Sequence, residues 1–144
     1  MSQVTRSAVI KNKPERIMEY IADVNNHTAF IGPLKSVSKL SGDPTKPGTS
    51  WTWTFMMAGV EFSGSAETVS YTPGKKFSYK TTSGILSTFS YSCESGGGGT
   101  TLKMEVSYEI PKTLLSKMQS AVVEKLNDAE GDRIVENIKA ILDQ

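Results

Sequence analysis

Few side chains in this sequence could carry out chemistry, and the first to consider are its single histidine, His27, and its single cysteine, Cys93. Nucleophilic catalysis needs a serine or cysteine beside a base, and a zinc or iron centre needs several histidine, cysteine or carboxylate ligands. Neither set can be assembled around these two residues, so His27 is interpreted as a surface or capping residue. The sequence therefore predicts no catalytic residue, no metal site and no cofactor.

Four consecutive glycines, Gly96 to Gly99, resemble a phosphate-binding loop at first sight. A phosphate cradle of this kind opens a helix and is followed by a Gly-Lys-Ser/Thr signature. Here the glycines lead into the alternating segment that starts at Thr100, which has the pattern of a strand. We therefore expect a hairpin loop at this position.

Aromatic side chains are the better candidates for a binding site. Trp51, Trp53 and Phe55 alternate along one expected strand, and Phe89 and Tyr91 alternate along another. Side chains two residues apart in a strand share a face of the sheet. Each stripe therefore presents its rings to one side, where a long helix would face them.

Two interpretations of these stripes remain open, a filled core and a ligand pocket. Tyr79, Tyr91 and Tyr108 favour a pocket, because a buried tyrosine hydroxyl needs a hydrogen-bond partner that water or a polar ligand would supply. The candidate ligand-binding residues are Trp51, Trp53, Phe55, Phe62, Tyr79, Phe89, Tyr91, Met104, Met118, Val122 and Leu126.

Turn residues divide the rest of the chain into elements that would position these side chains. Strands are expected near residues 4–11, 34–41, 49–57, 60–71, 76–82, 87–94 and 100–109. The short connections between them predict hairpins, and therefore an antiparallel sheet. Pro14 marks the start of a short helix, and Asp23 caps a second one that runs to about Phe30.

The last element is expected to be one unbroken helix from Lys112 to Gln144, about 45 Å long at 1.5 Å per residue. Its apolar residues recur at steps of three or four, or multiples of these, which predicts a buried stripe. Gly131 marks either a bend in this helix or a close approach to the sheet. The members of the stripe are Leu115, Met118, Val122, Leu126, Ala129 and Ile138.

Composition excludes several classes of function. The 144 residues predict one domain, 1–144, and the 16 basic and 15 acidic residues form no stripe of one sign. Nucleic acid and anionic membranes are therefore poor partners, and no segment is apolar enough for stable membrane insertion. The lone cysteine and the polar start of the chain predict a cytoplasmic protein. We also expect the protein to be a monomer or a weak homodimer.

The order of strand, two short helices, six strands and a long helix resembles the START-like (SRPBCC) superfamily of polyketide cyclase/dehydrase-like and lipid-transfer proteins. The resemblance covers nearly the whole chain and implies an α+β helix-grip fold, a curved seven-stranded antiparallel sheet packed on the C-terminal helix. The motifs that carry it are Ile10-x-x-x-Pro14-Glu15-x-Ile17-x-x-Tyr20-Ile21-x-Asp23, Pro47-Gly48-Thr49, Val69-x-Tyr71-x-Pro73-Gly74-Lys75-Lys76-Phe77 and Gly98-Gly99-Thr100-Thr101.

This fold hosts several activities, so the function must be argued from the site. We expect the chain to bind or carry a small hydrophobic or aromatic metabolite, or a lipid, between the sheet and the C-terminal helix. One alternative is a cyclase or dehydratase that uses the same cavity. A second is a co-chaperone-like interaction module with an exposed apolar patch. The residues that could move protons in the enzyme alternative are Tyr79, Tyr91, Glu61, Glu67 and Asp23.

Overall fold

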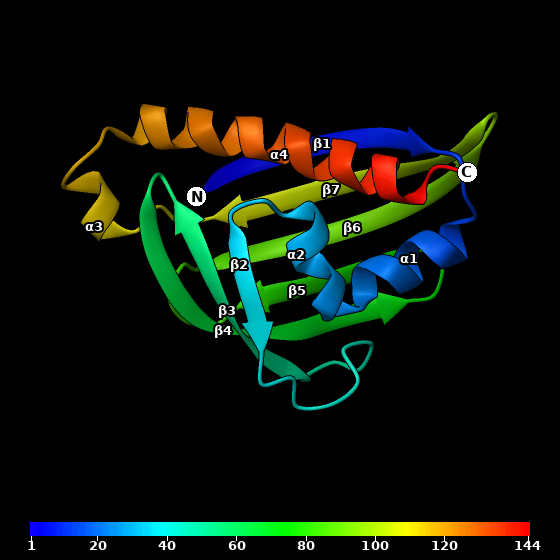
Figure 1. Ribbon diagram of the computed structural model, residues 1–144, viewed down its shortest axis with the longest axis horizontal. Helices are drawn as coiled ribbons and strands as arrows, with labels where there is room; N and C mark the ends of the chain where they lie inside the picture. Colours follow the sequence, from blue (N-terminus) through cyan, green and yellow to red (C-terminus); the bar gives the residue numbers. More distant parts are fainter.

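The computed structural model describes residues 1–144 and contains one curved sheet that wraps partly around a long helix (Figure 1). The strands pair in the order β1-β7-β6-β5-β4-β3-β2, and every neighbouring pair is antiparallel. The predicted seven-stranded antiparallel sheet is therefore confirmed. The strands are β1 Ser2–Ile10, β2 Leu34–Ser38, β3 Ser50–Met57, β4 Val60–Thr72, β5 Lys76–Thr81, β6 Ser87–Gly96 and β7 Gly99–Tyr108.

Short turns join the strands from β3 to β7, whereas residues 39–49 form a longer loop between β2 and β3. Between β3 and β4, Ala58 and Gly59 have φ angles of 51° and 82°. Two consecutive positive φ values give the hairpin turn whose twist matches that of the paired strands, and Gly59 adopts this backbone without strain. The turn fixes the register in which Phe55 lies opposite Phe62.

The helices lie on the concave side of the sheet (Figure 1). The first begins at Pro14, as predicted, and the Asp23 side chain accepts a hydrogen bond from the Asn25 amide at the start of the next turn. In chain order the helices are α1 Pro14–Ala22, the 3-10 helix η1 Val24–Asn26, α2 His27–Phe30, α3 Lys112–Leu115 and α4 Ser120–Leu142.

The C-terminal helix differs from the prediction because it does not start at Lys112. Helix α3 ends at Leu115, and Gln119 adopts an extended backbone with ψ 144° before α4 begins at Ser120. This break resets the helical phase, so α4 buries Val123, Gly131, Ile134, Val135 and Ile138. Of the six residues in the predicted stripe, Ile138 alone is fully buried, whereas Leu115, Val122 and Leu126 are each nearly half exposed.

Gly131 marks a close approach between α4 and the sheet. A Cβ atom at this position would lie 2.6 Å from Cγ1 of Val4 on β1, a distance that side-chain carbons do not adopt. The missing side chain therefore lets α4 lie directly on β1. This observation decides between the two roles that the sequence left open for Gly131.

A core of 26 apolar residues fills the space between the concave face of the sheet and the helices. It includes large side chains that are completely buried, such as Phe30, Phe77, Tyr91 and Ile138. None of the helices combines the length and the hydropathy that a transmembrane crossing requires.

Candidate functional site

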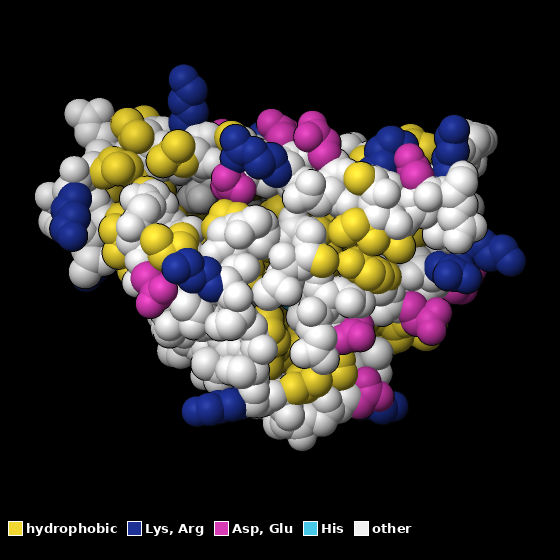
Figure 2. Space-filling view, in the orientation of Figure 1, with side chains coloured by type: hydrophobic (Ala, Val, Ile, Leu, Met, Phe, Trp, Pro, Cys, Tyr) yellow, Lys and Arg dark blue, Asp and Glu magenta, His cyan; other side chains and the backbone are white.

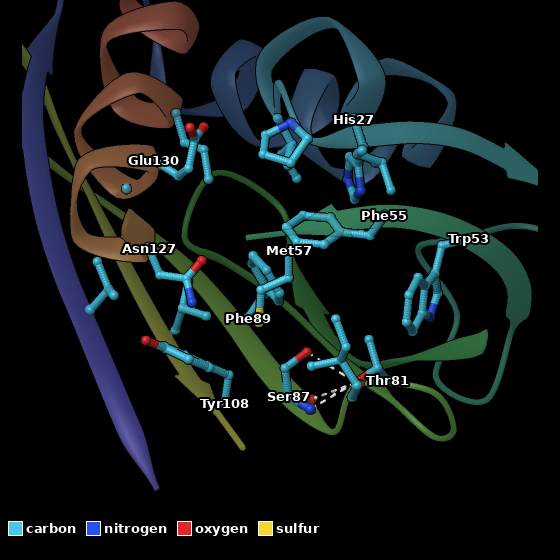
Figure 3. Close-up of a pocket in the computed structure, with 18 of the residues that line it drawn as sticks. His27, Trp53, Phe55, Met57, Thr81, Ser87, Phe89, Tyr108, Asn127 and Glu130 are labelled. Atoms are coloured by element: carbon cyan, nitrogen blue, oxygen red, sulfur yellow. Dashed lines mark hydrogen bonds between the residues drawn. The ribbon is translucent and has the colours of Figure 1, made fainter. Parts of the chain in front are cut away.

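The core is incomplete beneath α4, where a cavity of about 100 Å³ lies beside the contact with β1, between the helix and the concave face of the sheet (Figure 3). Twenty-two residues line this cavity, and 15 of them are hydrophobic. They come from α2, α4, the segment before β2, the turn between β5 and β6, and every strand except β4. The cavity therefore lies where a helix-grip fold encloses space between its sheet and its long helix.

Aromatic rings form the wall contributed by the sheet. Alternation along β3 turns Trp51 and Trp53 inward, and their indoles are almost fully buried. The Trp53 Nε1 donates a hydrogen bond to the Ser65 carbonyl at 3.0 Å, so its only polar atom is already paired. Tyr79 stacks on Phe89, its neighbour on β6, with ring centroids 4.9 Å apart. These rings offer apolar surface to the cavity.

His27 also lines the cavity, so the expected surface position of this residue was wrong, although its backbone forms the C-cap of η1. Helix α2 begins at His27 and turns its ring inward, where it stacks on Tyr79 at 5.3 Å. The Nε2 donates a hydrogen bond to the Ile21 carbonyl at 2.7 Å. Burial lowers the pKa of the imidazole to about 4. His27 is therefore a neutral side chain at physiological pH.

Two polar atoms of the cavity lining have no hydrogen-bond partner. They are the hydroxyl of Tyr108 on β7 and the amide nitrogen Nδ2 of Asn127 on α4, and both atoms are buried. Elsewhere in the lining, the hydroxyls of Thr81 and Ser87 lie 2.9 Å apart and the Ser87 amide donates to Thr81, so that pair is satisfied. The unpartnered polar groups are thus confined to the α4 side of the cavity.

Charge is nearly absent from the lining. No lysine or arginine contributes to it, and its one acidic residue, Glu130, pairs with Arg133 on the same helix. Burial raises the pKa of Tyr79 well above its ordinary value and also raises that of Tyr108. Both phenols therefore stay protonated at neutral pH and can act as hydrogen-bond donors.

The structure brings six of the eleven candidate ligand-binding residues to the cavity. These are Trp51, Trp53, Phe55, Tyr79, Phe89 and Met104. Alternation along β3, β5, β6 and β7 explains why all six could be predicted, because every second side chain of a strand points to the same face of the sheet.

The other five candidates lie outside the cavity lining. Tyr91 is completely buried deeper in the core, and Phe62 is half-buried on β4 opposite Phe55. Val122 and Leu126 lie on the exposed side of α4, and Met118 lies in the turn before it. Within α4, Val122 and Leu126 lie one residue, or about 100° around the helix, from Val123 and Asn127 on the inner face, and Met118 packs against the core from outside α4.

Sequence reasoning also missed cavity residues, notably Asn127, Glu130 and Ile134 on α4. One signal for Asn127 was available, since this residue lies four positions after Val123 and four before Gly131. A polar residue in phase with a buried stripe is a candidate for a functional role.

The chain matches a family model described as "Polyketide cyclase / dehydrase and lipid transport" over residues 1–143. It belongs to this family. Because the match covers nearly the entire sequence, the expected resemblance is confirmed. Among curated proteins, none has a sequence that matches this chain.

Solved structures share the fold at low sequence identity. A START superfamily protein from Mycobacterium smegmatis has a TM-score of 0.74 at 11% identity, covering 99% of this chain and 97% of that one. The major latex-like protein 151 of Panax ginseng has a TM-score of 0.70 at 14% identity, covering 97% and 96%. A protein from Chromobacterium violaceum has a TM-score of 0.71 at 13% identity, covering 100% and 99%. The helix-grip fold is therefore shown.

The family includes cyclases, so the groups that could move protons need a separate account. Glu61 pairs with Lys35 at 3.6 Å, Glu67 pairs with Lys80 at 3.3 Å, and Asp23 caps η1. None of these three carboxylates lines the cavity. No group of three or more histidine, cysteine or carboxylate residues is placed to hold a metal ion. Burial raises the pKa of the half-buried Cys93 thiol to about 11, so it stays protonated.

Proposed function

We propose that this chain binds a small, neutral, hydrophobic or aromatic molecule in the cavity beneath α4. The observation that carries the proposal is an apolar cavity with aromatic walls, no cationic side chain and one acidic residue that is already paired. Ligand sites in proteins combine such apolar walls with a few polar groups that orient the ligand. Tyr108 and Asn127 are polar groups of this kind.

The size of the cavity limits the ligand. An engineered cavity of about 150 Å³ holds benzene in another protein, and sites for drug-sized molecules start at about 300 Å³. The cavity under α4, at about 100 Å³, lies below both values. A molecule with one ring would need a small outward shift of the lining, and a lipid would need α4 to move away from the sheet.

The protonation states favour binding over acid–base catalysis. A general base works best with a pKa near the operating pH. The cavity instead holds phenols whose pKa is raised and a histidine whose pKa is lowered to about 4. These groups supply hydrogen bonds without exchanging protons at neutral pH, which supports a binding protein.

A matched pair of substitutions tests the proposal. Val106 lines the cavity from β7, whereas Val122 lies on the exposed side of α4. In Val106→Phe the added ring occupies part of the cavity, and in Val122→Phe the same ring extends into solvent. Titration of the ¹⁵N-labelled protein with toluene, followed by amide chemical shifts, measures the dissociation constant for each.

We expect saturable toluene binding to the parent protein and to Val122→Phe, and binding at least about fivefold weaker in Val106→Phe, since the two rings compete for one space. Equal weakening by both substitutions, or no saturable binding to the parent, would contradict the proposal. Amide spectra of both variants without toluene establish that each is folded.

A further inference from the structure

Two buried hydrogen-bond donors meet on one side of the cavity, and the protein satisfies neither. The Asn127 amide comes from α4 and the Tyr108 hydroxyl from β7, and both side chains lie on the same side of the cavity in Figure 3. Tyr108 is only 4% exposed. Buried polar groups are nearly always paired, and an unpaired one destabilises the protein. A ligand atom that accepts hydrogen bonds would remove this penalty.

The two donors are also close to each other. The Asn127 and Ser2 side chains lie near enough to the Tyr108 oxygen to oppose the rise in its pKa that burial causes, yet no hydrogen bond of normal geometry reaches this hydroxyl. Ser2 itself donates to Glu124 at 3.0 Å, so its hydroxyl hydrogen is already engaged. An acceptor between Asn127 and Tyr108 would therefore find two free donors.

The surrounding charges select a neutral acceptor. Glu124 and Asp128 lie near enough to Tyr108 to contribute to its raised pKa, and the one acidic residue of the lining, Glu130, already has its cation in Arg133. Arg6, which packs beside Gly131, is held outside by Asp132 at 2.5 Å and by the Asp128 carbonyl at 3.3 Å. A carboxylate ligand would meet these negative charges without a free cation to balance them.

We propose that Asn127 and Tyr108 form a subsite for a neutral acceptor oxygen, such as a ketone carbonyl, at one end of an otherwise apolar ligand. This subsite deepens the proposed function and depends on it, because the ligand body must occupy the apolar cavity. Phe55 and Trp53 lie across the cavity from the two donors (Figure 3), and Phe89 also lines it. They form the surface on which that body packs.

Three single-ring probes separate the contributions of shape, carbonyl and charge. Acetophenone carries a ketone, α-methylstyrene replaces the ketone oxygen with a methylene group at nearly the same shape, and benzoate carries a carboxylate. Dissociation constants come from amide chemical shifts of the ¹⁵N-labelled protein. The side-chain amide signals of Asn127, identified by their loss in Asn127→Leu, report directly on a new hydrogen bond.

We expect acetophenone to bind about three- to tenfold more tightly than α-methylstyrene, which is the gain from one net hydrogen bond. Benzoate should bind at least about tenfold more weakly than acetophenone. The Asn127 amide protons should shift downfield with acetophenone and remain unshifted with α-methylstyrene.

Substitutions then test whether Asn127 and Tyr108 cause the preference for acetophenone over α-methylstyrene. Asn127→Leu and Tyr108→Phe should each reduce the ratio between the two neutral probes toward one while α-methylstyrene still binds. Tyr91→Phe is the matched control, because Tyr91 also has a buried hydroxyl without a partner but does not line the cavity. This control should keep the ratio of the parent protein.

The outcomes distinguish the subsite from the binding function. If both neutral probes bind the parent protein equally well, the subsite proposal is overturned and the proposed function stands. Binding of neither probe would overturn both. A ratio that survives in Asn127→Leu and Tyr108→Phe would assign the preference to other residues and would also overturn the subsite.

Discussion

His27 shows how burial changes the role of a single residue. Its ring lies among the aromatic side chains of the core, and it donates one hydrogen bond to the Ile21 carbonyl. Burial deprives a protonated ring of solvation, and this effect lowers the pKa of His27 even though the Ile21 carbonyl and the Asp23 carboxylate act in the opposite direction. The histidine therefore contributes to the core as a polar aromatic ring.

The pKa of His27 predicts an acid-sensitive fold. The pKa is about 4 in the folded protein and about 6.5 in an unfolded chain. Between these values the unfolded state binds a proton that the folded state does not, so the free energy of unfolding decreases as the pH falls through this window. The decrease approaches about 3 kcal/mol near pH 4, because one pKa unit corresponds to about 1.4 kcal/mol.

Urea unfolding at pH 7 and at pH 4.5 measures this effect in the parent protein and in His27→Gln. The glutamine keeps an amide donor for the Ile21 carbonyl but cannot titrate. We expect the parent to lose clearly more stability than His27→Gln between the two pH values. An equal loss in both proteins would show that His27 does not titrate in this way.

At the scale of elements, the break between α3 and α4 determines which residues face the sheet. Because Gln119 is extended, α4 has a helical phase of its own and presents the stripe that includes Val123 and Ile138 to the sheet, while Val122 and Leu126 face outward. Figure 2 shows apolar side chains exposed along the edge of the molecule where α3 and the start of α4 lie. The two faces of α4 should therefore differ in their contribution to stability.

Alanine substitutions on the two faces test this difference. Ile138 is completely buried, and Leu126 is nearly half exposed. We expect Ile138→Ala to reduce the free energy of unfolding by about 2–5 kcal/mol, because it removes buried methyl groups and leaves a cavity. For Leu126→Ala we expect less than about 1 kcal/mol. Denaturant midpoints of both variants check the prediction, and a larger effect at Leu126 would contradict the observed phase of α4.

At the scale of the whole molecule, the sequence was sufficient to predict the sheet and its concave aromatic wall. Turn residues such as Pro73-Gly74 mark the strand ends, and alternation places Trp51 and Trp53 on the inner face because successive strand side chains point in opposite directions. These signals are local in the chain. They do not depend on how the elements pack.

The features that could not be predicted depend on packing between distant segments. A four-residue turn before Ser120 shifts the phase of a 23-residue helix, and no residue in that turn is a strong helix breaker. The inward position of His27 depends on how α2 packs over β5. Tyr108 and Asn127 come from different elements, so only the three-dimensional structure shows that both carry a buried polar atom without a hydrogen-bond partner.

The most direct test of the central claim is the position of a bound probe. Nuclear Overhauser effects between bound toluene and protein methyl groups report contacts shorter than about 5 Å, the range of side-chain neighbours. We predict contacts from toluene to the methyl groups of Met104, Val106 and Ile134, which line the cavity, and none to Val122 or Leu126. Contacts confined to Val122 and Leu126 would place the ligand on the outer face of α4 and contradict the account.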